Sequence, residues 1–177
     1  TILIFGEHTK ELSQGFRLTT NNRMELLAVI VGLEALIKKK ISVKIFSDSK
    51  YVVDSVEKGW VFSWEKKNFK KKKNVDLWKR FLLIYRKHDV KFTWVKGHAT
   101  QEHIDKSITT LVNKAGNDEA DITADIGTAL HGQEIINLAQ QFHNRHNDYQ
   151  QLMCDISHHI IEGYLIHREL LRIDELK

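Results

Sequence analysis

The amino-acid sequence predicts a mixed α/β fold, a sheet flanked by helices, followed by an all-helical tail. Up to residue 131, segments that alternate apolar and polar residues, as strands do, are interleaved with segments of helical periodicity. From Gly132 onward Gln, His and Asn dominate, and the apolar residues recur only at helical spacing. We therefore expect an α/β domain over residues 1–131 and a helical tail over residues 132–177.

Composition narrows the class of protein further. The 177 residues are 42% hydrophobic, which is enough for a core, and the formal net charge of +4 permits a polyanionic partner without demanding one. The single cysteine, Cys154, leaves no internal disulfide and fits a reducing compartment, so we expect a cytoplasmic protein. No apolar run has the length of a membrane span, so we expect no membrane partner.

The first element is expected to be a β-hairpin. Residues 1–5 form a β-type run, residues 6–10 read as a turn, and residues 11–18 suit the returning strand. Because the sequence opens at Thr1 inside an apolar run, we expect that an N-terminal piece is absent from it.

A buried helix is expected next. From Leu26 to Ile37 the chain is apolar on almost every side of a helix, and such helices are buried. Asn22 suits the N-cap position, and Glu25 three residues later could complete a capping box. We expect the helix to end near Lys38.

Two strands and three helices complete the predicted α/β part. The strands are expected at residues 42–47 and 90–95, where β-branched and aromatic residues alternate with polar ones. The helices are expected to start at Lys50, at Asn74 and after Gly116. Residues 100–115 read as a loop with room for one short helix.

Three acidic residues stand at comparable places in this arrangement. Glu25 falls in the first turn of the buried helix, Asp48 at a strand end and Asp121 at a helix start, and each alone could serve as a cap or offset a helix dipole. Strand ends of an open α/β sheet meet at one edge, where gathered carboxylates repel one another unless a cation holds them. Carboxylate oxygens suit Mg²⁺ or Mn²⁺, and two such ions can promote phosphodiester cleavage. His98, after a strand, could transfer a proton, although an ordinary surface histidine is the simpler interpretation of that residue alone.

Five blocks of the sequence resemble the signatures of ribonuclease H type 1, in the order and near the spacing of that family. They are TTNNRMEL at 19–26, SDSKYV at 47–52, KNVDLW at 73–78, WVKGHA at 94–99 and GNDEAD at 116–121. The resemblance covers roughly residues 1–128. It implies an endonuclease that cuts the RNA strand of RNA–DNA hybrids by a two-metal mechanism with Mg²⁺.

The resemblance also implies roles for particular residues. Glu25, Asp48 and Asp121 match metal-binding catalytic carboxylates, and His98 matches a loop histidine that aids turnover. A second group matches residues that hold the hybrid, whose wide minor groove is lined by 2′-hydroxyls. This substrate-binding group comprises Thr20, Asn21, Asn22, Asn74, Trp60, Trp64, Lys70 and Lys71. The last four fall where bacterial members carry a basic protrusion, but a solvated lysine face is the alternative for the lysines.

The sequence departs from the family pattern in three ways. The family's opening strand and its carboxylate are absent, so a catalytically impaired hybrid-binding module is the alternative function. His98 and Asp121 are 23 residues apart, a longer interval than the family's, which places an insertion over residues 100–114. The tail at 132–177 resembles no family that we recognise, and we expect an interaction arm that could self-associate. His143 and His146 share one helical face there, but without a carboxylate or cysteine pattern they indicate a metal site only weakly.

Overall fold

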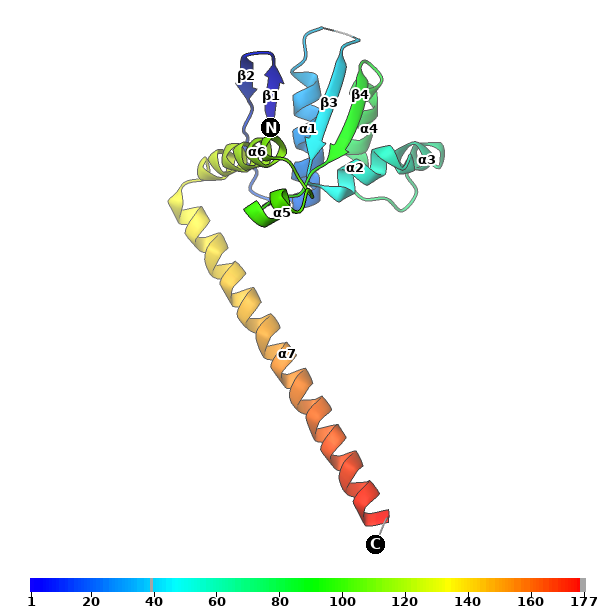
Figure 1. Cartoon of the computed structure of the whole chain (residues 1–177), viewed down its shortest axis with the longest axis vertical. Helices are drawn as coiled ribbons and strands as arrows, with labels where there is room; N and C mark the ends of the chain where they lie inside the picture. Colours follow the sequence, from blue (N-terminus) through cyan, green and yellow to red (C-terminus); the bar gives the residue numbers. More distant parts are fainter. Residues whose placement is uncertain (39, 176–177) are drawn as a thin grey trace. The chain divides into compact units, whose positions relative to one another are not determined.

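The computed structural model describes residues 1–38 and 40–175. The chain divides into two compact units, Thr1–Leu130 and His131–Lys177 (Figure 1). The first holds β1 (Ile2–Phe5), β2 (His8–Glu11), α1 (Asn21–Glu34), β3 (Ser42–Ser47), α2 (Lys50–Glu57), α3 (Trp60–Lys66), α4 (Val75–Tyr85), β4 (Asp89–Trp94), α5 (Gln101–Asp105) and α6 (Leu111–Ala129). The second holds α7 (Gln133–Glu175).

The strands form two small sheets of opposite type. β1 and β2 are antiparallel, with Ile2 opposite Glu11, whereas β3 and β4 are parallel, with Ser42 opposite Asp89 and Ser47 opposite Trp94. Among residues 1–38 and 40–175, no strand pairs with both sheets. The predicted mixed α/β class is confirmed.

The hairpin is tighter than the sequence predicts. Gly6 has a φ of +58°, which glycine adopts without steric cost, and Gly6 and Glu7 alone connect the strands. The ladder therefore runs from His8 to Glu11, and Thr1 and Leu12 exchange two further backbone hydrogen bonds beyond it, so the prediction of a returning strand over residues 11–18 is wrong.

The prediction that α1 is a buried helix is confirmed. Leu26, Ile30 and Leu33 of α1 are fully or almost fully buried. The predicted cap is wrong, because Thr20 is the N-cap and Asn22 lies inside the first turn. The helix ends at Glu34, four residues before the predicted end.

The core lies between α1, α2, α4 and the β3–β4 sheet. Trp78 and Phe81 of α4 are fully buried, and their rings contact each other with centroids 5.6 Å apart. Tyr51 of α2 meets Trp78 edge-on at 5.6 Å, and Phe92 of β4 meets Phe81 at 6.2 Å. These aromatic contacts fix α2, α4 and β4 relative to one another.

Helix α6 begins earlier than predicted. Thr110 caps it, since its Oγ1 accepts a hydrogen bond from the backbone N–H of Asn113 at 3.2 Å. Asp121 consequently lies in the middle of α6, and its predicted place at a helix start is wrong. The Ser13 hydroxyl donates to the Thr123 carbonyl at 2.6 Å and anchors this helix to the segment after β2.

The predicted helical tail is confirmed as one helix of 43 residues, α7. Within the described ranges, no helix is both long enough and apolar enough to cross a membrane.

Candidate active site

The parallel pairing of β3 and β4 brings the carboxyl ends of both strands to one place. Asp48 follows β3 directly, and the segment from Val95 to His98 follows β4. The Val95 N–H donates to the Ser47 carbonyl at 3.0 Å, and the indole N–H of Trp94 donates to the Asp48 carbonyl at 3.0 Å. The backbone at Asp48 is thus held by the neighbouring strand end, which is where α/β sheets form their sites.

Gly97 lies against the Asp48 side chain. A Cβ atom at Gly97 would stand 3.1 Å from both Cβ and Cγ of Asp48 and would overlap the Oδ2 oxygen. Only a residue without a side chain allows this close approach. The loop after β4 therefore fixes where the Asp48 carboxylate lies.

Glu25 enters from the second turn of α1 and is half-buried; its predicted place in the first turn is wrong, because the helix already begins at Asn21. Burial raises the pKa of Glu25, the negative charges of Asp48 and Asp121 raise it further, and the amino terminus opposes them. The three predicted carboxylates, from a helix, a strand end and a second helix, therefore act on one another electrostatically.

Asp121 faces the same region from α6 and is paired with His98. The pKa of Asp121 is raised overall. Burial is the largest cause, and the negative charge of Asp48 adds to it, whereas the positive charge of protonated His98 acts in the opposite direction. His98 Nδ1 lies 3.5 Å from Asp121 Oδ2, and its side chain is 89% exposed. His98 also has a φ of +47°, an unusual backbone conformation for a residue other than glycine. The fold thus brings His98 and Asp121 close together in space although they are far apart in the sequence.

The carboxylates come within electrostatic range without forming a tight ligand cluster. Within residues 1–38 and 40–175, no three His, Cys, Asp or Glu residues are grouped closely enough to hold one metal ion. The donor chemistry nevertheless fits a hard divalent cation, because these are oxygen ligands, and burial together with neighbouring negative charge raises the pKa of Glu25 and Asp121.

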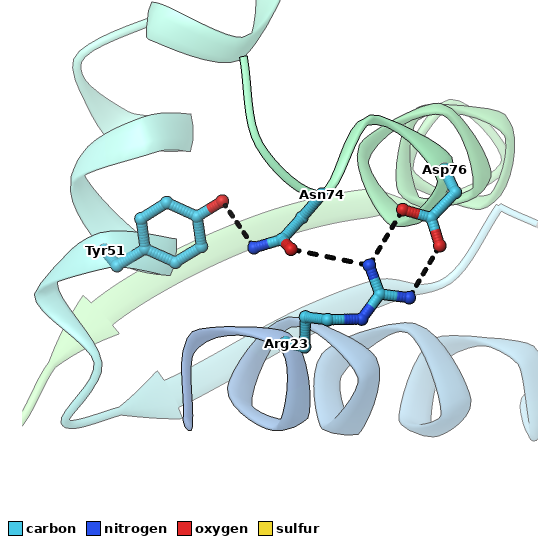
Figure 2. A network of polar contacts seen from close by, with 4 residues as sticks. All are labelled: Arg23, Tyr51, Asn74 and Asp76. Carbon is cyan, nitrogen blue, oxygen red and sulfur yellow. Dashed lines mark hydrogen bonds and ion pairs between the residues drawn. The ribbon is translucent and has the colours of Figure 1, made fainter. Parts of the chain in front are cut away.

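Asn74 sits at the centre of a polar network that joins α1, α2 and α4 (Figure 2). Its Nδ2 donates to the Tyr51 hydroxyl at 3.3 Å, and its Oδ1 accepts from Arg23 Nη1 at 3.4 Å. Tyr51 also accepts from the Trp78 indole at 2.8 Å. Arg23 is itself held by two hydrogen bonds to Asp76, at 2.9 and 2.6 Å. The amide of Asn74 is therefore oriented from both sides.

The side-chain amide of Asn74 retains hydrogen-bonding groups that could bind a ligand. An amide has two N–H donors and an oxygen with two lone pairs, so the two bonds described leave one donor and one acceptor. Asn74 has a φ of +55° at the N-cap of α4, and its side chain makes no capping bond. Sequence reasoning did not assign Arg23 and Tyr51 to the site, although both lie inside the blocks at 19–26 and 47–52.

The other predicted substrate-binding residues lie on two surfaces. Thr20, Asn21 and Asn22 are exposed at the start of α1. Trp60 and Trp64 are on α3, and Lys70 and Lys71 are exposed in the following loop, which the buried Phe69 anchors. Trp60 is 44% exposed, but the Trp64 ring packs edge-on against Trp78 at 5.7 Å. Trp60 therefore offers more surface to a ligand than Trp64 does.

A mixed α/β fold with acidic side chains directed to its strand ends is typical of an α/β enzyme. The RNase H family model matches residues 1–129, so the chain belongs to the RNase H family. The predicted resemblance to ribonuclease H type 1 is confirmed, and with it the assignment to a family of nucleases.

Similar proteins agree with this assignment. A ribonuclease H of Syntrophus aciditrophicus is 47% identical over 131 residues, which are 71% of this chain and 74% of that one. A ribonuclease H of Rippkaea orientalis is 51% identical over 104 residues, 56% of this chain and 63% of the relative. The crystal structure of LC9-RNase H1, a type 1 RNase H with the type 2 active-site motif, matches with a TM-score of 0.51 and 32% identity. That match covers 65% of this chain and 50% of LC9-RNase H1.

Proposed function

We propose that this chain hydrolyses the RNA strand of RNA–DNA hybrids endonucleolytically. The observation that carries the proposal is the approach of Glu25, Asp48 and Asp121 from three separate elements to within electrostatic range, where burial and neighbouring negative charge raise the pKa of Glu25 and Asp121. Membership of the RNase H family supports hybrid as the substrate class.

Glu25, Asp48 and Asp121 would hold Mg²⁺, with Mn²⁺ as a substitute. When bound, two such ions supply an activated water and stabilise charge on the leaving oxygen. The raised pKa of Glu25 supports this role, because a carboxylate held near other acids gains most when a cation offsets their repulsion.

His98 is proposed to move a proton at the same site. Its ring is exposed and lies beside Asp121, so it can reach both solvent and the reacting phosphate. When protonated, its imidazole could donate to the leaving oxygen.

The exposed polar groups are proposed to hold the duplex. Thr20, Asn21 and Asn22 at the start of α1, together with the oriented amide of Asn74, can exchange hydrogen bonds with 2′-hydroxyls and the backbone. Trp60 and Trp64, with Lys70 and Lys71, are proposed to contact the other strand through stacking and phosphate charge.

A hybrid-binding module with impaired catalysis is the second candidate. One observation favours it: the described residues bring no three potential ligands into a single metal-binding group. Binding of the hybrid without cleavage would then be the chain's activity.

We also propose how the parts of the chain divide this work. Residues 1–131 are proposed as the nuclease unit, and residues 132–177 as an arm for self-association, because no residue between Gln133 and Glu175 is buried. A cytoplasmic location stays a prediction from the single cysteine, Cys154.

The test uses one nucleotide sequence prepared as hybrid, duplex RNA and duplex DNA, each end-labelled. With Mg²⁺ or Mn²⁺ we expect internal cuts in the RNA strand of the hybrid alone, and loss of those cuts with a chelator. Fluorescence anisotropy on the same hybrid measures binding independently. Binding without cuts would favour the second candidate, and neither binding nor cuts would reject both.

A further inference from the structure

We propose that α7 pairs with the α7 of a second copy of this chain as a parallel, in-register coiled coil. The proposal rests on the self-association proposed above and adds the partner, the contacting face and the orientation. It is independent of the hybrid site, which lies in the first unit.

The sequence of α7 divides into six consecutive heptads over residues 134–175. In coiled-coil notation, the a positions are Ile135, Phe142, Tyr149, Ile156, Gly163 and Leu170. The d positions are Leu138, Arg145, Leu152, His159, Ile166 and Ile173. Nine of these twelve are apolar, so an a/d seam runs the length of the helix.

The apolar side chains of this seam are exposed and do not pack against other described residues of their own unit. Phe142 and Ile166 are each 63% exposed, and no residue between Gln133 and Glu175 is buried. A helix of 43 residues is about 64 Å long, and an exposed apolar stripe of that length marks an interaction surface. Helices gain most of their stability by packing such a face, so α7 requires a partner of similar length.

The flanking charges select the orientation of that partner. The g positions are Glu134, Gln141, Asp148, Asp155, Glu162 and Glu169, of which five are acidic. In an antiparallel pair g faces g of the other helix, so acid would meet acid along the whole length. In a parallel pair g faces e, and the first five e positions are Ala139, His146, Met153, Ile160 and His167. None of these five is acidic. The sixth e position is Asp174, which Glu169 would face, so the parallel arrangement leaves one acid–acid contact where the antiparallel one sets acid against acid along the helix.

The seam also selects an identical partner in register. Its interruptions are Arg145, His159 and Gly163. In register, each interrupting residue faces the same residue of the other helix, so only three levels of the coiled coil lack an apolar pair. In a shifted register, the interrupting residues of the two helices fall at different levels, and more levels lack an apolar pair. The same register places Glu162 beside His167 of the other helix, a complementary contact. A second copy is therefore the occupant that this face fits.

Self-association is tested by measuring the mass of the full chain in solution at micromolar concentration by sedimentation. We expect the mass of two chains. The double variant Leu152→Glu with Ile156→Glu places charge in the seam and should have the mass of one chain. The matched control, Gln150→Glu with Ser157→Glu, adds the same charge outside the seam and should stay a pair. The proposed dimer would be overturned if the parent had the mass of one chain, if the seam variant kept the mass of two chains, or if the parent formed an assembly larger than two chains.

Orientation is tested by oxidation of Leu138→Cys in a Cys154→Ser background. A parallel pair places this d position opposite itself near one end, so a disulfide-linked dimer should form within minutes of mild oxidation. The matched control Ile136→Cys, outside the seam, should cross-link far less. A two-chain mass without cross-linking at position 138 would overturn the parallel orientation and leave self-association standing. Cleavage of hybrid, measured separately, reports on the nuclease proposal alone.

Discussion

Replacing Gly97 by Ala should displace the Asp48 carboxylate and slow cleavage of the hybrid. The new Cβ would lie 3.1 Å from Cβ and Cγ of Asp48 and overlap Oδ2, so either the carboxylate or the loop after β4 must move. A shift of about 1 Å at a catalytic group costs roughly 100-fold in rate. Overpacking of this kind also destabilises a fold by about 1–3 kcal/mol. We therefore expect a loss of roughly 100-fold in rate together with a lower melting temperature.

Gly116→Ala is the matched control for this substitution. Gly116 lies within α6, and no heavy atom stands within 4 Å of the position that its Cβ would take. Alanine is more favourable than glycine inside a helix by about 0.5–1 kcal/mol, so this variant should be slightly more stable and fully active. Initial cleavage rates and thermal unfolding of both variants provide the comparison. A Gly97→Ala variant with the parent's rate and stability would refute the close approach to Asp48.

Three further predictions concern charge and hydrogen bonding. Burial and neighbouring acids raise the pKa of Glu25, so the folded chain binds the carboxyl proton of Glu25 more tightly than the unfolded chain does. This binding stabilises the fold at low pH, and the stabilisation is lost as pH rises through the pKa of Glu25 in the folded chain. Glu25→Gln should therefore be about 1 kcal/mol more stable at pH 7 yet inactive, and melting curves against pH that match the parent's would contradict this. Tyr51→Phe removes the acceptor that orients Asn74 and should weaken hybrid binding by roughly 3- to 10-fold, with a smaller effect on the rate of bound substrate; equal affinity would show that the network has no positioning role. Serine at each position from Lys70 to Lys73 should lower the slope of log affinity against log salt by about 0.7–0.9 per lost phosphate contact, and an unchanged slope would mean a solvated lysine face.

The pattern of apolar residues was sufficient to predict most of the elements. The buried α1 followed from an apolar run that no surface helix would carry, and the strands β3 and β4 followed from alternation. The start of α6 was missed because Gly116 resembles a boundary, whereas Thr110 supplies the capping oxygen that decides where the helix begins. The start of β2 was also predicted wrongly, because the turn was expected to be longer than it is. The positive φ at Gly6 allows the chain to reverse within two residues.

The site was predicted less completely than the fold. Glu25, Asp48, His98 and Asp121 could be named from five short blocks, but the pairing of His98 with Asp121 depends on how the inserted residues fold. Arg23 reaches Asn74 and Asp76 across more than 50 residues of sequence, and such a contact leaves no local signal. The approach of Gly97 to Asp48 depends likewise on the register of two parallel strands.

The most direct test of the proposed active site is the cleavage rate of a labelled RNA–DNA hybrid with Asp48→Asn. Asparagine keeps the size of the side chain and removes its charge, so the fold should persist while the site loses one anionic ligand. Asp54→Asn is the control, because Asp54 is an acid of α2 paired with Lys58 at 2.8 Å, and surface pairs of this kind contribute little. We predict Mg²⁺-dependent cuts in the RNA strand with the parent and Asp54→Asn, and none with Asp48→Asn. An Asp48→Asn variant that cuts the hybrid at the parent rate would contradict the assignment of this site.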